Sequence, residues 1–282
     1  MSDSADTRPD PAERRFRTEP VSFTRRGGRL NPRQQKAWDL LADRVVLDVP
    51  QDGPSTSVHP AHRFDAAAEF GRAGRLVVEI GSGRGEVIVH AAGESPETDF
   101  LGLEVYVPGV AQTLIGVRHG ELTNVRLAVV NAAEALTTMI PEASVDELWV
   151  NFPDPWHKKK HHKRRLVTPE FAALAARVLK PGGVWRLATD WAEYAAQMAD
   201  VVAGSPDFEG GPSERWGGRV LTRFEAKGIA AGREIHDLTA VRVGRDASTS
   251  GARRRPVSAL RSSVEASLSL LAVQRDDSRN EK

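Results

Sequence analysis

Short apolar segments alternate with longer amphipathic segments through the middle of the chain. The apolar segments are typical of buried β-strands, because each is only a few residues long and ends near a glycine or a polar residue. We expect strands at RLVVEIG (75–81), DFLGLEV (99–105), NVRLAVVN (124–131), VDELWVNF (145–152) and GVWRLATD (183–190).

The intervening segments carry the apolar period of helices. We expect helices at 86–92, 108–119, 132–140, 168–180 and 191–202. The clearest is 168–180, because Thr168 can cap its first turn, Pro169 fits the first helical position and Gly182 follows its end.

Regular alternation of strands and helices predicts an α/β fold with a mostly parallel sheet that helices cover on both faces. Two later segments, RVLTRFEAKG (219–228) and REIHDLTAVRV (233–243), are expected to close the sheet as an antiparallel C-terminal strand pair. In such sheets, ligands bind beyond the carboxyl ends of the parallel strands. The residues that follow each strand are therefore the candidates for chemistry.

Both ends of the chain lack this pattern. Residues 1–20 are rich in Pro, Asp, Arg and Ser, so we expect a disordered N-terminal arm, a single domain at 21–245 and a disordered tail at 246–282. The sequence contains no run of eighteen apolar residues, so we expect no membrane span. Its first residues do not resemble a secretory signal. The sequence has no cysteine, which excludes disulfides and cysteine-bound zinc. We expect a cytoplasmic protein.

Positive charge is concentrated in one short run. The net charge of the 282 residues is only +1, yet every residue of HKKKHHKRR (157–165) is Lys, Arg or His. Such a local cluster is typical of a surface that meets a polyanion, although a charge run alone is more often a solvated loop. The histidines have no carboxylate or further histidine at ligand spacing, so we expect no metal site.

A glycine loop follows the first predicted strand. In EIGSGRGE, Glu79 precedes Gly81, Gly83 and Gly85, which let a ligand approach the backbone at a helix N-terminus. Glu104 ends the next strand, where an acid can accept both hydroxyls of an adenosine ribose. The spacing differs from the G-x-G-x-x-G of dinucleotide sites, but NAD(P) stays the second candidate ligand.

Together, these residues resemble the S-adenosylmethionine site of class I methyltransferases, whose fold is Rossmann-like. The sulfonium and ammonium groups of that cofactor favour a nearby carboxylate such as Glu79. Asn131, after the third strand, stands where this class contacts the adenine. The class commonly has Asp there, but Asn can also donate and accept hydrogen bonds.

A more specific resemblance starts at NFPDPWHKKKHHKRRL (151–166). Together with FTRRGGRLNPRQ (23–34), ATDW (188–191) and LTRFEAKG (221–228), it resembles the bacterial tRNA (guanine-N7-)-methyltransferases, with the motifs in the family's order over about 23–242. The resemblance implies methylation of guanine N7 in tRNA, at guanosine 46 of the variable loop, with no obligatory protein partner. Whether the protein is a monomer or a homodimer stays open.

The resemblance also implies roles for single residues. Glu79, Glu104, Asn131 and Asp154 would line the cofactor, with Asp154 as the catalytic residue. The substrate-binding residues would be Lys158, Asp190, Thr222, Arg223, Phe224 and Glu225. Cations that could neutralise tRNA phosphates are Lys159, Lys160, Lys163, Arg164, Arg165, Arg26 and Arg29.

The chemistry of guanine N7 fits a site that works by positioning. Its in-plane lone pair is unprotonated at neutral pH, so the enzyme must align N7 with the methyl group rather than remove a proton. A carboxylate that accepts from the guanine N1–H and N2 amino groups would select guanine and stabilise its growing positive charge. Asp154 and Asp190 are the candidates, and Phe152 or Trp156 could either stack on a base or pack in the core.

Two other functions remain open from the sequence. One is an RNA-binding protein that has kept the fold without catalysis, and the other is an NAD(P)-dependent oxidoreductase. The glycine spacing and the basic run disfavour the oxidoreductase. The presence of Glu79, Asp154 and Asp190 disfavours the binding-only protein.

Overall fold

The computed structural model describes residues 28–53 and 55–244, and every structural statement below concerns these residues. They contain a seven-stranded sheet. Its strands lie in the order β3 (Val125–Ala128), β2 (Thr98–Leu103), β1 (Arg75–Ile80), β4 (Val145–Asn151), β5 (Leu179–Thr189), β7 (His236–Arg242) and β6 (Phe208–Ser213).

Neighbouring strands from β3 to β5 are parallel, and β7 runs antiparallel to both β5 and β6. The predicted mostly parallel sheet with an antiparallel C-terminal pair is therefore confirmed. The strand order reverses between β1 and β4, because the chain first moves outwards to β3 and then returns to the centre. Such a switch point opens a crevice at the carboxyl ends of the two strands, where ligands of this architecture bind.

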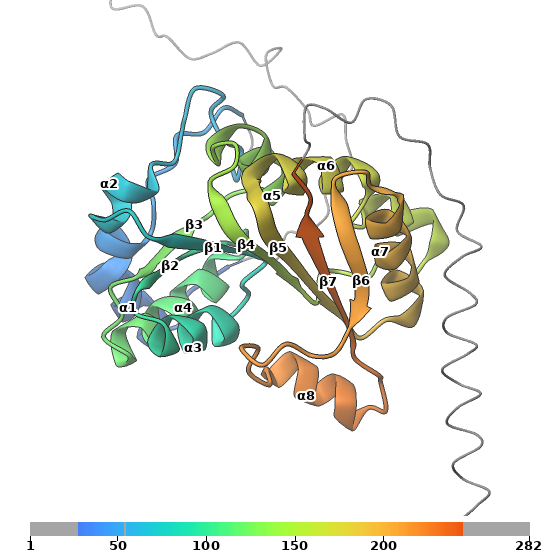
Figure 1. Ribbon diagram of the computed structural model, residues 1–282. Coiled ribbons are helices and arrows are strands. Elements are labelled where there is room, and N and C mark those ends of the chain that lie inside the picture. Colours follow the sequence, from blue (N-terminus) through green and yellow to red (C-terminus); the bar gives the residue numbers. More distant parts are fainter. Residues whose placement is uncertain (1–27, 54, 245–282) are drawn as a thin grey trace, which may run out of the picture. The chain divides into compact units, whose positions relative to one another are not determined.

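Helices pack on both faces of the sheet (Figure 1). They are α1 (Pro32–Val45), α2 (Ala66–Phe70), α3 (Glu86–Glu94), α4 (Val107–His119), α5 (Ala132–Glu134), α6 (Pro169–Val178), α7 (Ala192–Gly204) and α8 (Arg223–Ala230), with a π-helical turn at Ala135–Met139 and a 3₁₀ helix at Lys159–Arg164. The five helices predicted from the sequence are present, and α1, α2, α8 and the 3₁₀ helix are additional.

Two hydrophobic clusters divide the core between the faces. Side chains alternate along β1, so Val77 packs in the cluster that contains residues of α1, α3 and α4, whereas Val78 packs in the cluster with residues of α6 and α7. Large side chains such as Trp185 and Tyr194 are fully buried in the second cluster. Burial of β1 on both faces explains its nearly continuous apolar sequence.

The closing antiparallel pair uses a different segment from the one predicted. Residues 219–228 were expected to form a strand, but most of them form helix α8, because Thr222 accepts a hydrogen bond from the Glu225 amide and caps its first turn. The strand beside β7 is β6, which contains Gly210, Gly211 and Pro212. These residues have low strand propensity, and proline is tolerated here because β6 is an edge strand.

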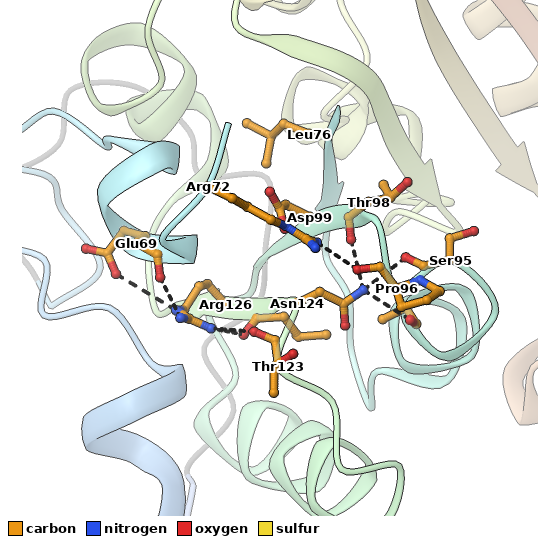
Figure 2. Close-up of polar contacts among 12 residues, drawn as sticks. Glu69, Arg72, Leu76, Ser95, Pro96, Thr98, Asp99, Thr123, Asn124 and Arg126 are labelled. Atoms are coloured by element: carbon orange, nitrogen blue, oxygen red, sulfur yellow. Dashed lines mark hydrogen bonds and ion pairs between the residues drawn. The ribbon is translucent and has the colours of Figure 1, made fainter. Parts of the chain in front are cut away.

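A polar network fixes the amino-terminal ends of β2 and β3 (Figure 2). The Asn124 amide nitrogen donates to the carbonyl oxygens of Ala92, Ser95 and Thr98, and the Arg72 guanidinium lies 2.6 Å from Oδ1 of buried Asp99. These groups hold the crossover from α3 into β2 at the end of the sheet opposite the strand carboxyl ends. Their role is structural.

No helix within 28–53 and 55–244 is long and apolar enough to cross a membrane. The expected disordered arm at 1–20 and tail at 246–282 lie outside the described residues, so these domain boundaries stay predictions.

Candidate active site

The glycine loop joins the end of β1 to the start of α3. Gly81, Gly83 and Gly85 have φ angles of 69°, 57° and 74°, a region that side chains strongly disfavour. A Cβ atom on Gly85 would lie 2.4 Å from Thr113 of α4, whereas one on Gly81 would meet nothing within 4 Å. Gly85 therefore allows close helix packing, and Gly81 leaves open space where a ligand can approach the backbone.

Glu104 follows β2 and holds the glycine loop. Its Oε2 atom accepts from the Gly83 amide at 2.7 Å, and its Oε1 atom accepts from the amides of Val105 and Tyr106 at 2.7 and 2.9 Å. Burial raises the pKa of Glu104, although these amides oppose the rise. The carboxylate is thus fixed in one direction at the strand end, with lone pairs left for further donors.

Glu79 and Asn151 meet at the switch point between β1 and β4. The Asn151 Nδ2 atom donates to Glu79 Oε1 at 3.1 Å. Burial raises the pKa of Glu79 to about 7, the Asn151 hydrogen bond opposes that rise, and the charge of Glu104 adds to it. A buried carboxylate in this environment favours a cation.

Three buried polar atoms, at the ends of β1 and β4 and in the glycine loop, have no hydrogen-bond partner among the described residues: Glu79 Oε2, Asn151 Oδ1 and Ser82 Oγ. Unpaired buried polar groups are costly, so their presence together indicates that a polar ligand completes the site. Two acceptors and one hydroxyl suit the charged amino-acid portion of S-adenosylmethionine. The residues at this position therefore fit the predicted cofactor.

Asn131 lies three residues beyond β3 and caps α5. Its Oδ1 atom accepts from the Ala133 amide at 2.9 Å, so this oxygen is already used by the helix. The Nδ2 group has no hydrogen-bond partner within the described residues and can donate to a ligand. If Asn131 contacts the adenine as predicted, it does so as a hydrogen-bond donor through Nδ2, because its Oδ1 atom already accepts from the helix.

Asp154 stands in a strained turn after β4. Phe152 and Trp156, on either side of the Pro153–Pro155 segment, have φ angles of 53° and 47°. Aromatic residues rarely adopt such angles, and strain of this kind clusters at functional sites. The Asp154 side chain is exposed, and its charge adds to the burial that raises the pKa of Glu104.

Asp190 directly follows β5, and its carboxylate is already paired. Its Oδ2 atom lies 2.8 Å from Arg233 Nε, in the loop between α8 and β7, and only 8% of its side chain is exposed. The predicted guanine contact by Asp190 must therefore share this carboxylate with Arg233.

The predicted substrate segment divides into buried and exposed residues. Thr222 is used as the cap of α8, and Glu225 is completely buried, where its carboxylate pairs with Arg215 and Arg219. The sequence prediction of direct substrate contact does not fit these two residues, because the ion pairs need Glu225 inside the protein. Arg223 and Phe224 are exposed.

The start of helix α8 contacts the start of α3, which directly follows the glycine loop. Oε2 of Glu86, the first residue of α3, accepts from the Arg223 amide at 2.7 Å, and the Phe224 ring lies 5.3 Å from the Phe152 ring. The two exposed residues of the substrate segment therefore reach both the cofactor loop and the turn that carries Asp154. An aromatic pair in this position can stack on a base.

The basic run forms the 3₁₀ helix and its flanks. Lys158, Lys159, Lys160 and Lys163 are exposed, and the Arg164 guanidinium lies 4.9 Å above the Trp156 ring. Arg29 is also exposed, in the segment that precedes α1, whereas Arg26 lies outside the described residues. The exposed cations form a surface directly after the Asp154 turn, and their binding to a polyanion stays a prediction.

Arg165 departs from that prediction. Its residue is only 3% exposed, and its guanidinium donates to the carbonyl oxygen of Pro155 and to Oε1 of Gln197, each at 2.8 Å. The guanidinium is therefore not available to a phosphate on the surface. The sequence could not separate Arg165 from its neighbours, since all the residues of the run look alike in composition.

Sequence reasoning also missed the buried partners of the site. Arg219 pairs with Asp237 at 2.7 Å and with Glu225 at 2.9 Å, and its guanidinium lies 5.3 Å from the Phe152 ring. No local sequence pattern reveals this network, because its members come from α8, β7 and the loop between β6 and α8. Among residues 28–53 and 55–244, no group of three His, Asp or Glu side chains could hold a metal ion.

Comparisons with known proteins find relatives of this chain. The family model described as "Putative methyltransferase" matches residues 73–238. The chain is 58% identical over 189 residues to the tRNA (guanine-N(7)-)-methyltransferase of Arthrobacter sp. (strain FB24). This alignment covers 67% of this chain and 59% of the length of that protein. It is 45% identical over 272 residues to the protein of the same name in Paenarthrobacter aurescens (strain TC1). That alignment covers 78% of this chain and 90% of the relative.

Among solved structures, the 16S rRNA methyltransferase KamB superposes on this chain with a TM-score of 0.48 at 16% identity. The superposition covers 65% of this chain and 95% of the KamB chain.

Proposed function

Because the chain belongs to the tRNA (guanine-N(7)-)-methyltransferase family, we propose that it transfers the methyl group of S-adenosylmethionine to N7 of a guanine in tRNA. The proposal includes guanosine 46 of the variable loop as the acceptor. It also includes a cytoplasmic location, since the tRNA substrate is found there.

One observation carries the proposal: a single turn joins the cofactor crevice to the basic surface. The turn starts at Asn151, which hydrogen-bonds to buried Glu79, and it leads through exposed Asp154 to the lysines that begin at Lys158. A methyl donor held on one side and a phosphate backbone held on the other would meet at Asp154. A binding-only protein would not need the polar crevice.

Bound S-adenosylmethionine supplies an electrophilic methyl group on a positively charged sulfur. In the proposal, Glu79 faces the charged amino-acid end of the cofactor, and Glu104 accepts from the ribose hydroxyls, with the Gly83 amide keeping its carboxylate in place. The Asn131 amide donates to the adenine. The open backbone at Gly81 allows the cofactor to lie against the strand end.

Guanine is held on the other side of the crevice. The Phe152–Phe224 pair provides an aromatic surface for the base, and Asp154 accepts from its N1–H and N2 amino groups. Positive charge moves to the purine as N7 gains the methyl group, and the Asp154 carboxylate stabilises that charge without taking a proton from N7. Catalysis then rests on alignment and electrostatics.

The test is nucleoside mass spectrometry. Purified protein is incubated with tRNA that lacks N7-methylguanosine and with S-adenosylmethionine carrying an isotopically labelled methyl group. We expect label in N7-methylguanosine alone, and digestion into fragments should assign it to guanosine 46. Label in another nucleoside would contradict the reaction, and label in N7-methylguanosine elsewhere would contradict only the position.

A further inference from the structure

Arg165 makes a set of contacts that differs from those of every other cation in the basic run. Only 1% of its side chain is exposed. Nε donates to the Pro155 carbonyl oxygen at 2.8 Å and Nη1 donates to Gln197 Oε1 at 2.8 Å, while the guanidinium lies 4.9 Å from the Tyr194 ring. The side chain therefore connects the turn after β4 to helix α7.

These contacts need the fork of an arginine. The donors on Nε and Nη1 point to two acceptors on different segments. A lysine ammonium also has several donors, but they radiate from a single nitrogen and do not reproduce this fixed fork. The nearest carboxylate, Oε1 of Glu193, lies 3.9 Å from Nη2 and is half exposed. Burying a cation is costly unless its hydrogen bonds offset the lost hydration, so the two acceptors hold this guanidinium in place.

The segment that Arg165 holds is poorly supported by its own backbone. Pro153 and Pro155 have no N–H group, so neither can donate a hydrogen bond within the turn. Phe152 and Trp156 carry the positive φ angles on either side. Backbone strain of this kind persists only where surrounding groups fix it.

The other end of the connection is rigid. Tyr194 is completely buried in the core, and its hydroxyl oxygen accepts from the Val167 amide at 3.0 Å. Gln197, on the same helix, donates to the Val167 carbonyl oxygen at 2.9 Å. Helix α7 therefore offers Arg165 a fixed anchor against which the turn can be held.

We propose that Arg165 is a positioning residue, which fixes the carbonyl of Pro155 and thereby aims the Asp154 carboxylate at the guanine. This inference rests on the proposed function of Asp154. It assigns Arg165 to turnover rather than to tRNA affinity, although the residue stands at the end of a run of RNA-facing cations. Misplacement of a reacting group by about 1 Å can cost on the order of a hundredfold in rate.

The experiment compares Arg165→Gln and Arg165→Lys with Lys163→Gln, a matched loss of one charge at an exposed position of the same run. Single-turnover methylation at saturating tRNA and cofactor is measured together with tRNA affinity at several salt concentrations. For Arg165→Gln we expect turnover to fall roughly 10- to 100-fold, with tRNA affinity within about twofold and an unchanged salt slope. Lys163→Gln should instead weaken tRNA binding and lower the salt slope by about 0.7–0.9.

Arg165→Lys separates charge from geometry. It keeps the positive charge but loses the fork, so turnover should stay well below that of the unmodified protein. Full recovery by lysine, or an Arg165→Gln variant that matches Lys163→Gln, would overturn the proposal. If Arg165→Gln fails to fold, as judged by thermal melting and cofactor binding, the lysine variant alone decides the outcome.

A double substitution tests whether Arg165 acts through Asp154. In an Asp154→Asn background, Arg165→Lys should cost less than about threefold in turnover, because the group that it positions is already lost. Full additivity of the two losses would contradict a positioning role. If the unmodified protein does not methylate guanine N7, the proposed function fails. If it does, and the Arg165 variants turn over at the same rate as the unmodified protein, only this inference is rejected.

Discussion

The Nδ2 atom of Asn151 lies 3.1 Å from Oε1 of Glu79, and this hydrogen bond joins the ends of the two central strands at the switch point of the sheet. The second oxygen of Glu79 is buried without a partner among the described residues. The protein thus keeps a costly carboxylate where a cationic ligand is expected to bind. That cost has a measurable dependence on pH.

Cofactor affinity should fall as Glu79 takes up a proton. The pKa of Glu79 is raised to about 7, above its ordinary value of 4.5, so the group is largely protonated below neutral pH and cannot attract a cation. We expect affinity for S-adenosylmethionine to be constant above pH 7 and to fall about tenfold per pH unit below it. Titration calorimetry from pH 5.5 to 7.5 measures this.

Glu79→Gln provides the control for that titration. The affinity of this variant for S-adenosylmethionine should be weak at every pH from 5.5 to 7.5, and it should not fall as the pH is lowered, because no carboxylate remains at position 79 to take up a proton. An affinity of the unmodified protein that stays the same from pH 7.5 down to pH 5.5 would show that no buried carboxylate titrates on binding.

Glu104→Gln should weaken cofactor binding by about 10- to 100-fold, the loss of charge-assisted hydrogen bonds worth roughly 1.5–3 kcal/mol. The carboxylate of Glu104 now accepts hydrogen bonds from the backbone amides of Gly83, Val105 and Tyr106. In the glutamine variant, the side-chain NH₂ group would face one or more of these N–H donors and could not accept from them. Glu94→Gln, at the exposed far end of α3, is the matched control and should bind normally. Equal affinities in the two variants would remove Glu104 from the site.

Replacing Lys159, Lys160, Lys163 and Arg164 with glutamine should weaken tRNA binding and reduce its salt dependence. The expected reduction is about 0.7–0.9 of a log–log unit for each tRNA phosphate that is no longer neutralised. Cofactor affinity should not change. Lys180→Gln, which removes a charge at the start of β5 where Lys180 pairs with Asp146, is the control for charge alone. An unaltered salt slope in the fourfold variant would mean that the run is a solvated loop.

Asp237→Asn should destabilise the protein by about 3 kcal/mol, because it leaves the buried guanidinium of Arg219 with an incomplete set of partners. Loss of this support should also disturb α8, since Glu225 is bound to the same arginine. Arg223→Gln, at an exposed position of α8, should change stability by less than about 0.5 kcal/mol. Urea denaturation of both variants measures the difference, and a small effect of Asp237→Asn would show that the pair contributes little.

The parallel sheet and the cofactor side of the site could be predicted because both follow from local patterns. Buried strands have short apolar sequences, and the three acids lie at strand ends: Glu79 is the last residue but one of β1, Glu104 directly follows β2, and Asp154 lies three residues after β4. Helix α1 also carried a readable signal, since Asn31 and Gln34 form a capping box around Pro32, although it was not predicted.

Other features depend on contacts between distant segments. Strand β6 was missed because its glycines and proline do not resemble a strand, and only pairing with β7 defines it. The burial of Arg165 follows from the position of α7, which no pattern within 157–165 reveals. The ion pairs of Glu225 likewise come from the fold, so a residue that looks like part of a substrate motif proves to support the helix.

Single-turnover methylation of two tRNAs that differ at one atom tests the central claim most directly. One carries guanosine at the acceptor position, and the other carries 7-deazaguanosine, in which a C–H group replaces N7. We expect rapid methylation of the first and none of the second, while both bind with the same affinity because the phosphate contacts are unchanged. Methylation of the 7-deazaguanosine tRNA at a comparable rate would contradict guanine N7 as the acceptor.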